Sequence, residues 1–120
     1  MNNSNQTDIA FEKVILKKFE SPDEVRLFDK GKFELINLGG MTIGRATYEP
    51  GWRWSIDVGA ALDEMFCRVE HVGMVISGCA TAAIEGQEPI EMRSGDLFYV
   101  PSLPHDSWVV GDEPYVSIHF

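Results

Sequence analysis

The sequence predicts an all-β domain, built as a sandwich or barrel of short antiparallel strands. From residue 33 onward, glycine and proline divide the chain into roughly nine short runs of the length that strands adopt. Several of these runs are rich in β-branched and aromatic residues, which strands favour. No stretch has the apolar periodicity of a long amphipathic helix.

The length and composition fit one globular domain. The chain has 120 residues, of which 44% are hydrophobic and 24% are charged. We expect residues 1–10, which are polar and rich in Asn and Gln, to form a disordered terminus, and residues 11–120 to form the domain. No run approaches the roughly 20 apolar residues of a membrane span. The first residues also lack the basic start and apolar stretch of a signal peptide, so we expect a cytoplasmic protein.

Charge and cysteine content exclude several classes of function. The formal net charge is -9, with 19 acidic and 10 basic residues, and no basic stripe is present. Such a chain repels the phosphates of nucleic acids and anionic membrane surfaces. Cys67 and Cys79 are too few for a disulfide framework, so free thiols in a reducing compartment are expected.

The first elements are predicted from local signals. Residues 14–16 read as a short strand. Residues 21–28 open with Ser21, which suits a helix cap, and Pro22, which suits a first helical position, so they predict one or two helical turns or an ordered loop. The runs 33–38 and 41–48 predict two strands, separated by Gly39 and Gly40.

The later elements follow the same pattern after an Ala- and Gly-rich connection over residues 58–65. The predicted strands cover residues 66–68, 72–76, 79–84, 90–92, 96–100, 107–110 and 115–120. Terminal segments of a small barrel often extend a sheet across a two-fold axis, so we expect a homodimer.

Two glycine-anchored segments hold side chains that commonly bind metals. The candidate ligands are Asp57, Cys67, His71 and His105. On one straight strand Cys67 and His71 would lie about 13 Å apart. Metal ligands must come within roughly 2.0–2.3 Å of an ion, so the chain must turn at residues 68–70 if both bind one ion. Beyond that turn, His71, Gly73 and Val75 would face inward, with Gly73 leaving room or marking a bulge.

Each candidate also has a simpler interpretation. Cys67 can be a small buried side chain, and Asp57 can be a solvated turn residue. His105 is the strongest candidate, because the prolines before it stiffen its approach. His119 lies in the last strand and can face inward, but no spacing connects it to the others.

Three tryptophans form the remaining feature. Trp52 and Trp54 are expected to share one strand face on either side of Arg53, and Trp108 follows His105. Such residues usually pack a core, and alternatively form an aromatic wall around a small ligand.

The spacing of the second segment resembles a motif of the cupin family, G(X)5PXG(X)2H(X)3N. Gly95 and Pro101 match it, and His105 comes one residue early. In the first motif, G(X)5HXH(X)3-4E(X)6G, His71 falls at the Glu position, Cys67 at the second His and Asp57 at the first His.

Longer strings resemble small single-domain bacterial cupins. They are TIGRATYEPGWRWS at residues 42–55 and HDSWVVGDEP at residues 105–114. The resemblance implies a cupin-like β-barrel, or double-stranded jelly roll. It departs at Asp57, where that subgroup has a His.

The resemblance also implies a site that binds a divalent transition metal. Thiolate and imidazole donors suit Zn²⁺ or Fe²⁺ better than Mg²⁺ or Ca²⁺. We expect either a metal-dependent enzyme acting on a small organic substrate or a non-catalytic domain that binds or senses metal or a small ligand. Glu64 and Glu70 are the nearest candidates for a general base, and no catalytic residue is assigned.

Overall fold

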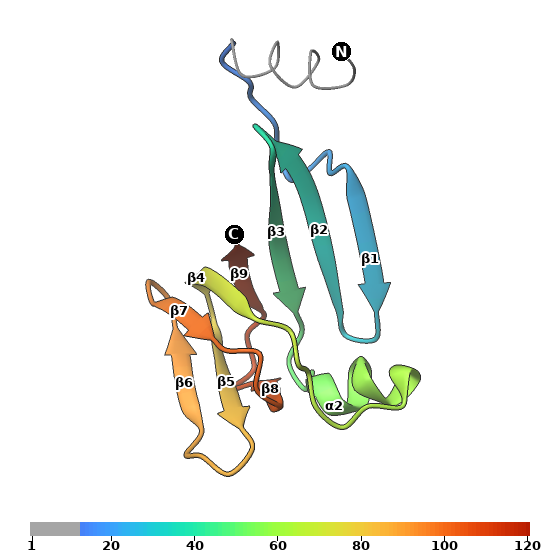
Figure 1. Ribbon diagram of the computed structural model, residues 1–120, viewed down its shortest axis with the longest axis vertical. Helices are drawn as coiled ribbons and strands as arrows, with labels where there is room; N and C mark the ends of the chain where they lie inside the picture. The colour runs from blue at the N-terminus through green and yellow to red at the C-terminus, as the bar shows by residue number, and fades with distance from the viewer. Residues whose placement is uncertain (1–12) are drawn as a thin grey trace.

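The computed structural model describes residues 13–120, which form two facing antiparallel sheets (Figure 1). The expected disordered terminus, residues 1–10, lies outside the described residues. One sheet has six strands in the order β1-β2-β3-β9-β4-β7, and the other has three in the order β6-β5-β8. The strands are β1 (Glu24–Phe28), β2 (Gly31–Leu38), β3 (Met41–Tyr48), β4 (His71–Ser77), β5 (Cys79–Ile84), β6 (Ile90–Arg93), β7 (Leu97–Val100), β8 (His105–Val109) and β9 (Tyr115–His119).

This arrangement confirms the all-β, jelly-roll-like fold, although the sheets do not close into a continuous barrel. Within residues 13–120 the two sheets remain separate, and only isolated bridges, such as the one between Cys67 and His105, add to their ladders. Two short helical segments, α2 (Trp54–Asp57) and the 3-10 turn η1 (Gly59–Leu62), occupy the connection between β3 and β4. No helix in the described part of the chain has the length and apolar character needed to cross a bilayer.

The hairpin of β2 and β3 shows how turn residues set the register. Gly39 and Gly40 adopt φ angles of 56° and 82°, which glycine tolerates without the strain of a side chain. The strands then pair without interruption from Leu38↔Met41 to Gly31↔Tyr48. In Figure 1, β1, β2 and β3 extend the larger sheet to one side of the smaller sheet.

Three early predictions are wrong. Residues 14–16 form no strand, and Val14 and Leu16 are almost fully exposed. The predicted helical turns of residues 21–28 are instead largely β1, which pairs with β2 from Glu24↔Leu35 to Phe28↔Gly31. Sheet pairing therefore outweighs the local helix-capping residues. The predicted strand at 66–68 is reduced to the single bridge made by Cys67.

The predicted alternation along β4 is confirmed. Gly73 and Val75 are buried, while Val72 on the opposite face is exposed. The space at Gly73 is filled by protein: an added Cβ would meet the backbone oxygen of Ile118 and approach the Phe98 ring to 2.7 Å. Gly73 thus allows close packing and leaves no room for a ligand, and the nearby bulge lies at Val75/Ser77.

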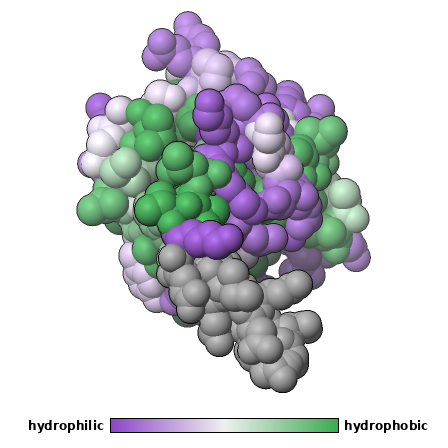
Figure 2. Space-filling view, turned by 90° about the horizontal axis from the view of Figure 1, so that it is seen from above, coloured by the Kyte–Doolittle hydropathy of each residue, from purple (hydrophilic) through white to green (hydrophobic). Residues whose placement is uncertain are grey.

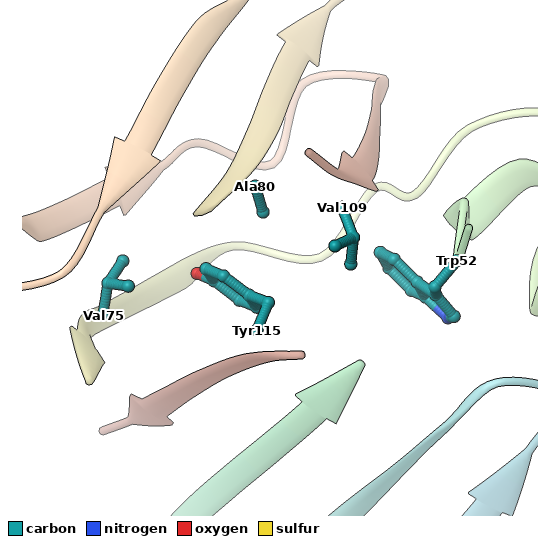
Figure 3. Close-up of a cluster of buried hydrophobic side chains, with 5 residues drawn as sticks. All are labelled: Trp52, Val75, Ala80, Val109 and Tyr115. Atoms are coloured by element: carbon teal, nitrogen blue, oxygen red, sulfur yellow. The ribbon is translucent and has the colours of Figure 1, made fainter. Parts of the chain in front are cut away.

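A compact apolar core lies between the sheets. Its buried members are Trp52, Val75, Ala80, Val109 and Tyr115, which Figure 3 shows pointing into the space between strands of the two sheets. The Trp52 ring stacks on Tyr48 with centroids 3.8 Å apart. Trp52 is 1% exposed, as the core interpretation predicted. Trp54 does not share its strand, because the chain turns into α2 at that residue.

The outer face of the six-stranded sheet carries exposed apolar side chains. Val72 pairs with Tyr99 across β4 and β7, and Leu97 lies two residues before Tyr99. The exposed fractions are 44% for Val72, 61% for Tyr99 and 76% for Leu97. Figure 2 shows hydrophobic residues gathered in patches on the surface seen from above. Apolar patches of this kind often mark contacts between proteins.

Candidate metal centre

Cys67 and His105 are held side by side by their backbones. The Cys67 amide donates to the His105 carbonyl at 2.7 Å, and the His105 amide donates to the Cys67 carbonyl at 3.0 Å. This reciprocal pair places two residues that are far apart in the sequence directly opposite each other. Both residues are buried, with 5% and 3% of their surface exposed.

His71 enters the same space from the start of β4. Residues 68–70 carry the chain onward without a turn, because Cys67 pairs with His105 and His71 pairs with Val100. Cys67 Sγ nevertheless lies 3.6 Å from His71 Nε2. Ligands at about 2.3 Å (S) and about 2.05 Å (N) from a tetrahedral Zn²⁺ lie about 3.6 Å apart. The observed separation therefore matches the edge of a tetrahedral site. The turn expected at residues 68–70 is wrong, because the two side chains approach each other without a reversal of the backbone.

A backbone contact orients the His105 ring. Its Nδ1 lies 2.8 Å from the Leu103 carbonyl oxygen. A carbonyl only accepts hydrogen bonds, so Nδ1 carries the proton and Nε2 keeps its lone pair for a metal. Metal-binding histidines usually have such a contact, because it fixes both the tautomer and the ring orientation.

Together, Cys67, His71 and His105 form a three-residue donor set. One donor atom from each lies within 4.8 Å of the others. Burial raises the pKa of the Cys67 thiol, and burial, with a smaller effect from His105, lowers the pKa of His71 to about 4. At neutral pH His71 is therefore ready to bind a cation, whereas Cys67 must lose a proton to do so.

Asp57, the fourth predicted ligand, lies outside this donor set. It ends α2, where its Oδ2 accepts a hydrogen bond from the Arg53 amide at 2.8 Å. Its Oδ1 lies 3.5 Å from the ammonium group of Lys30. The carboxylate thus stabilises a helical turn, and the structure does not bring it to the three donors.

Asp106, the residue after His105, holds the same turn from the other side. Its carboxylate accepts hydrogen bonds from the Ser55 amide at 3.0 Å, from the Ser55 hydroxyl at 2.8 Å and from Arg53 at 2.9 Å. The Arg53 guanidinium also stacks on Trp108, 4.1 Å from the ring centroid. This network ties α2 to β8, the strand that begins with His105.

His119 is the site residue that sequence reasoning did not connect to the others. Its ring centroid is 5.6 Å from that of His71, and its Nε2 lies 2.9 Å from Ser117 Oγ. Burial, assisted by the charge of His71, lowers the pKa of His119 to about 4. Alternation along β9 was the available signal, because Tyr115, Ser117 and His119 share one face.

The three donors border a cavity of about 100 Å³. Its lining is aromatic, aliphatic and weakly polar: Tyr48, Trp52, Trp54, Cys67, His71, Ala80, Ala82, Met92, Phe98, Val100, His105, Ser107, Tyr115, Ser117 and His119. The lining that the structure describes contains no Asp, Glu, Lys or Arg. Glu64 is instead near Arg68, at 3.8 Å, and Glu70 accepts a hydrogen bond from Tyr99 at 2.7 Å.

Known structures share this fold. No protein-family model and no curated protein matches the sequence. A protein of unknown function from Acidithiobacillus ferrooxidans is 17% identical, with a TM-score of 0.64, over 92% of this chain and 95% of that one. A sugar phosphate isomerase from a cupin superfamily, from Silicibacter pomeroyi, is 16% identical, with a TM-score of 0.63, over 88% and 73%.

Oxalate decarboxylase from Bacillus subtilis also contains a similar domain. It is 20% identical, with a TM-score of 0.57, over 81% of this chain but only 26% of its own length. Identities this low establish the fold and leave the activity open. With its two facing sheets and these structural neighbours, the chain is a small domain of the cupin-like fold.

Proposed function

We propose that the domain binds one Zn²⁺ or Fe²⁺ ion through Cys67, His71 and His105, and that a small organic substrate reacts in the adjoining cavity. The convergence of three buried, soft donors at the edge of an apolar cavity carries this proposal. Among the divalent ions, thiolate and imidazole favour transition metals over Mg²⁺ and Ca²⁺.

Three protein ligands are typical of catalytic sites that keep a coordination position open for water or substrate. When bound, such an ion polarises a carbonyl or activates water. The chain supplies the apolar walls that exclude water. His119, hydrogen-bonded to Ser117, also lines the cavity and can accept a proton from a molecule bound there.

The structural neighbours support a small-molecule function. Two of them are named as a sugar phosphate isomerase and an oxalate decarboxylase, both of which act on small molecules. Their low identity to this chain gives no support for either reaction in particular.

A non-catalytic domain that binds or senses metal or a small ligand is the second candidate. It is favoured by the absence of carboxylates from the described lining of the cavity, since a carboxylate is a common general base. Metal-loaded protein whose absorption changes on adding small carbonyl compounds, and which converts them, supports the enzyme. A saturating spectral change without conversion supports the binding domain.

Metal content tests the site itself. Wild-type protein, His105→Ala and Cys79→Ala are each incubated with Zn²⁺, desalted and analysed for bound metal. Cys79 is a matched control because it is the other free thiol and lies on β5, outside the donor set. We expect one ion per chain in wild type and Cys79→Ala, and loss of stoichiometric metal in His105→Ala. Equal metal in all three proteins would rule the site out.

A further inference from the structure

We propose, building on the proposed metal site, that the cavity accepts small neutral or singly negative molecules and discriminates against dianions such as dicarboxylates and phosphate esters. The inference rests on the charges that surround the cavity and on its size. The charge of the metal and its three ligands is combined with the lack of charged side chains in the described lining.

No fixed cation lines the cavity. Its described lining holds neither Lys nor Arg, and apart from the donor set its polar groups are the hydroxyls of Ser and Tyr, the Trp indoles and His119. Two cationic side chains near the segment that holds Trp52 and Trp54 interact with other groups. Arg53 pairs with Asp106 and stacks on Trp108, and Lys30 lies near Asp57.

The donor set therefore decides the charge of the site. A divalent ion bound by the Cys67 thiolate and two neutral imidazoles carries one net positive charge. A singly negative ligand neutralises this positive charge. A neutral ligand leaves the net charge at plus one, as a bound water molecule does. A dianion leaves one uncompensated negative charge among aromatic and aliphatic side chains, where burial of an unpaired charge is strongly unfavourable.

The volume limits the ligand further. An engineered cavity of about 150 Å³ accommodates benzene, so about 100 Å³ corresponds to a ligand of roughly four to six non-hydrogen atoms. The walls of Phe98, Val100 and Met92 favour an apolar substituent beside the metal-binding oxygen. The structure thus favours short-chain carbonyl compounds and 2-oxo acids with one carboxylate.

Pyruvate and oxalate form a matched pair of probes. They have the same number of non-hydrogen atoms and can bind a metal through the same O–C–C–O unit. Pyruvate has a methyl group where oxalate has one oxygen of its second carboxylate, so pyruvate carries one negative charge and oxalate carries two. Protein loaded with Co²⁺ is titrated with each compound, and the visible absorption of the metal reports binding. We expect pyruvate to bind at least about tenfold more tightly than oxalate.

A charge introduced into the wall provides the second arm. Met92→Lys should shift the ratio of the two dissociation constants toward oxalate by about tenfold or more. Met92→Leu, which keeps the wall apolar, should leave the ratio as in wild type. Cobalt content is measured first. Wild type that takes up no cobalt contradicts the metal site itself. Loaded wild type that binds oxalate at least as tightly as pyruvate, or a ratio that Met92→Lys leaves unchanged, overturns the charge selectivity alone.

Discussion

Replacing His119 by Gln tests how strongly the interior of the domain opposes a buried charge. His119 lies beside His71, and its Nε2 lies 2.9 Å from Ser117 Oγ. Burial, followed by the charge of His71, lowers its pKa from 6.5 to about 4. Gln keeps a polar group near Ser117 but does not titrate in this range.

The sign and size of the effect follow from proton linkage. Below pH 6.5 the unfolded chain binds a proton at His119, and the folded chain does so only near pH 4. The stability from neutral His119 is therefore present above about pH 6.5 and is lost as the pH falls toward 4. At pH 5, which is about 1.5 units below the pKa of His119 in the unfolded chain, this loss lowers the free energy of unfolding by at most about 2 kcal/mol.

Urea unfolding in the presence of EDTA, at about pH 7.5 and about pH 5, measures this difference. Wild type should lose about 2 kcal/mol more stability between the two pH values than His119→Gln does. Carboxylates that titrate in both proteins cancel in this comparison, and His71 still titrates in both. Equal losses in the two proteins would show that His119 is not held neutral by burial.

Three further predictions concern the donor set, the turn beside it and the outer sheet face. Zinc binding should release close to one proton from the Cys67 thiol, because burial raises its pKa and the thiol is protonated before the metal binds. Calorimetry in two buffers of different ionisation enthalpy counts the released protons. Undiminished proton release from Cys67→Ser contradicts the assignment. Asp106→Asn should lower the free energy of unfolding by about 1–3 kcal/mol, because it weakens charge-assisted hydrogen bonds to Ser55 and Arg53; thermal unfolding with no change in midpoint contradicts this role. The homodimer expected from the sequence stays a prediction. Sedimentation velocity should show a dimer that Leu97→Lys converts to monomer, and a monomeric wild type contradicts it.

Most of the fold was predictable because its turns are marked in the sequence. Gly39 and Gly40 set the first long hairpin, and the breakers from Pro50 onward separate the later strands. The signals failed at residues 21–28, where Ser21 and Pro22 favour a helix locally. Strand β1 forms there because β2 offers a pairing edge, which is a non-local interaction that the local capping signals do not reflect.

The candidate site was only partly predictable. Cys67, His71 and His105 were identified from spacing, and the structure brings all three together. Asp57 has equally suitable spacing, but the short helix α2 directs its carboxylate to the Arg53 amide. His119 was missed because its place beside His71 depends on the pairing of β9 with β4, where Gly73 lies opposite it.

X-ray absorption on the metal-loaded protein tests the central claim most directly, because it distinguishes a sulfur ligand from nitrogen and oxygen ligands and recognises imidazole rings. The proposed site predicts one sulfur from Cys67, two imidazole nitrogens from His71 and His105, and a light atom from solvent in the remaining position. Replacing solvent with pyruvate should change only that light-atom contribution. A metal shell without sulfur, or one with a third imidazole, would contradict the proposed site.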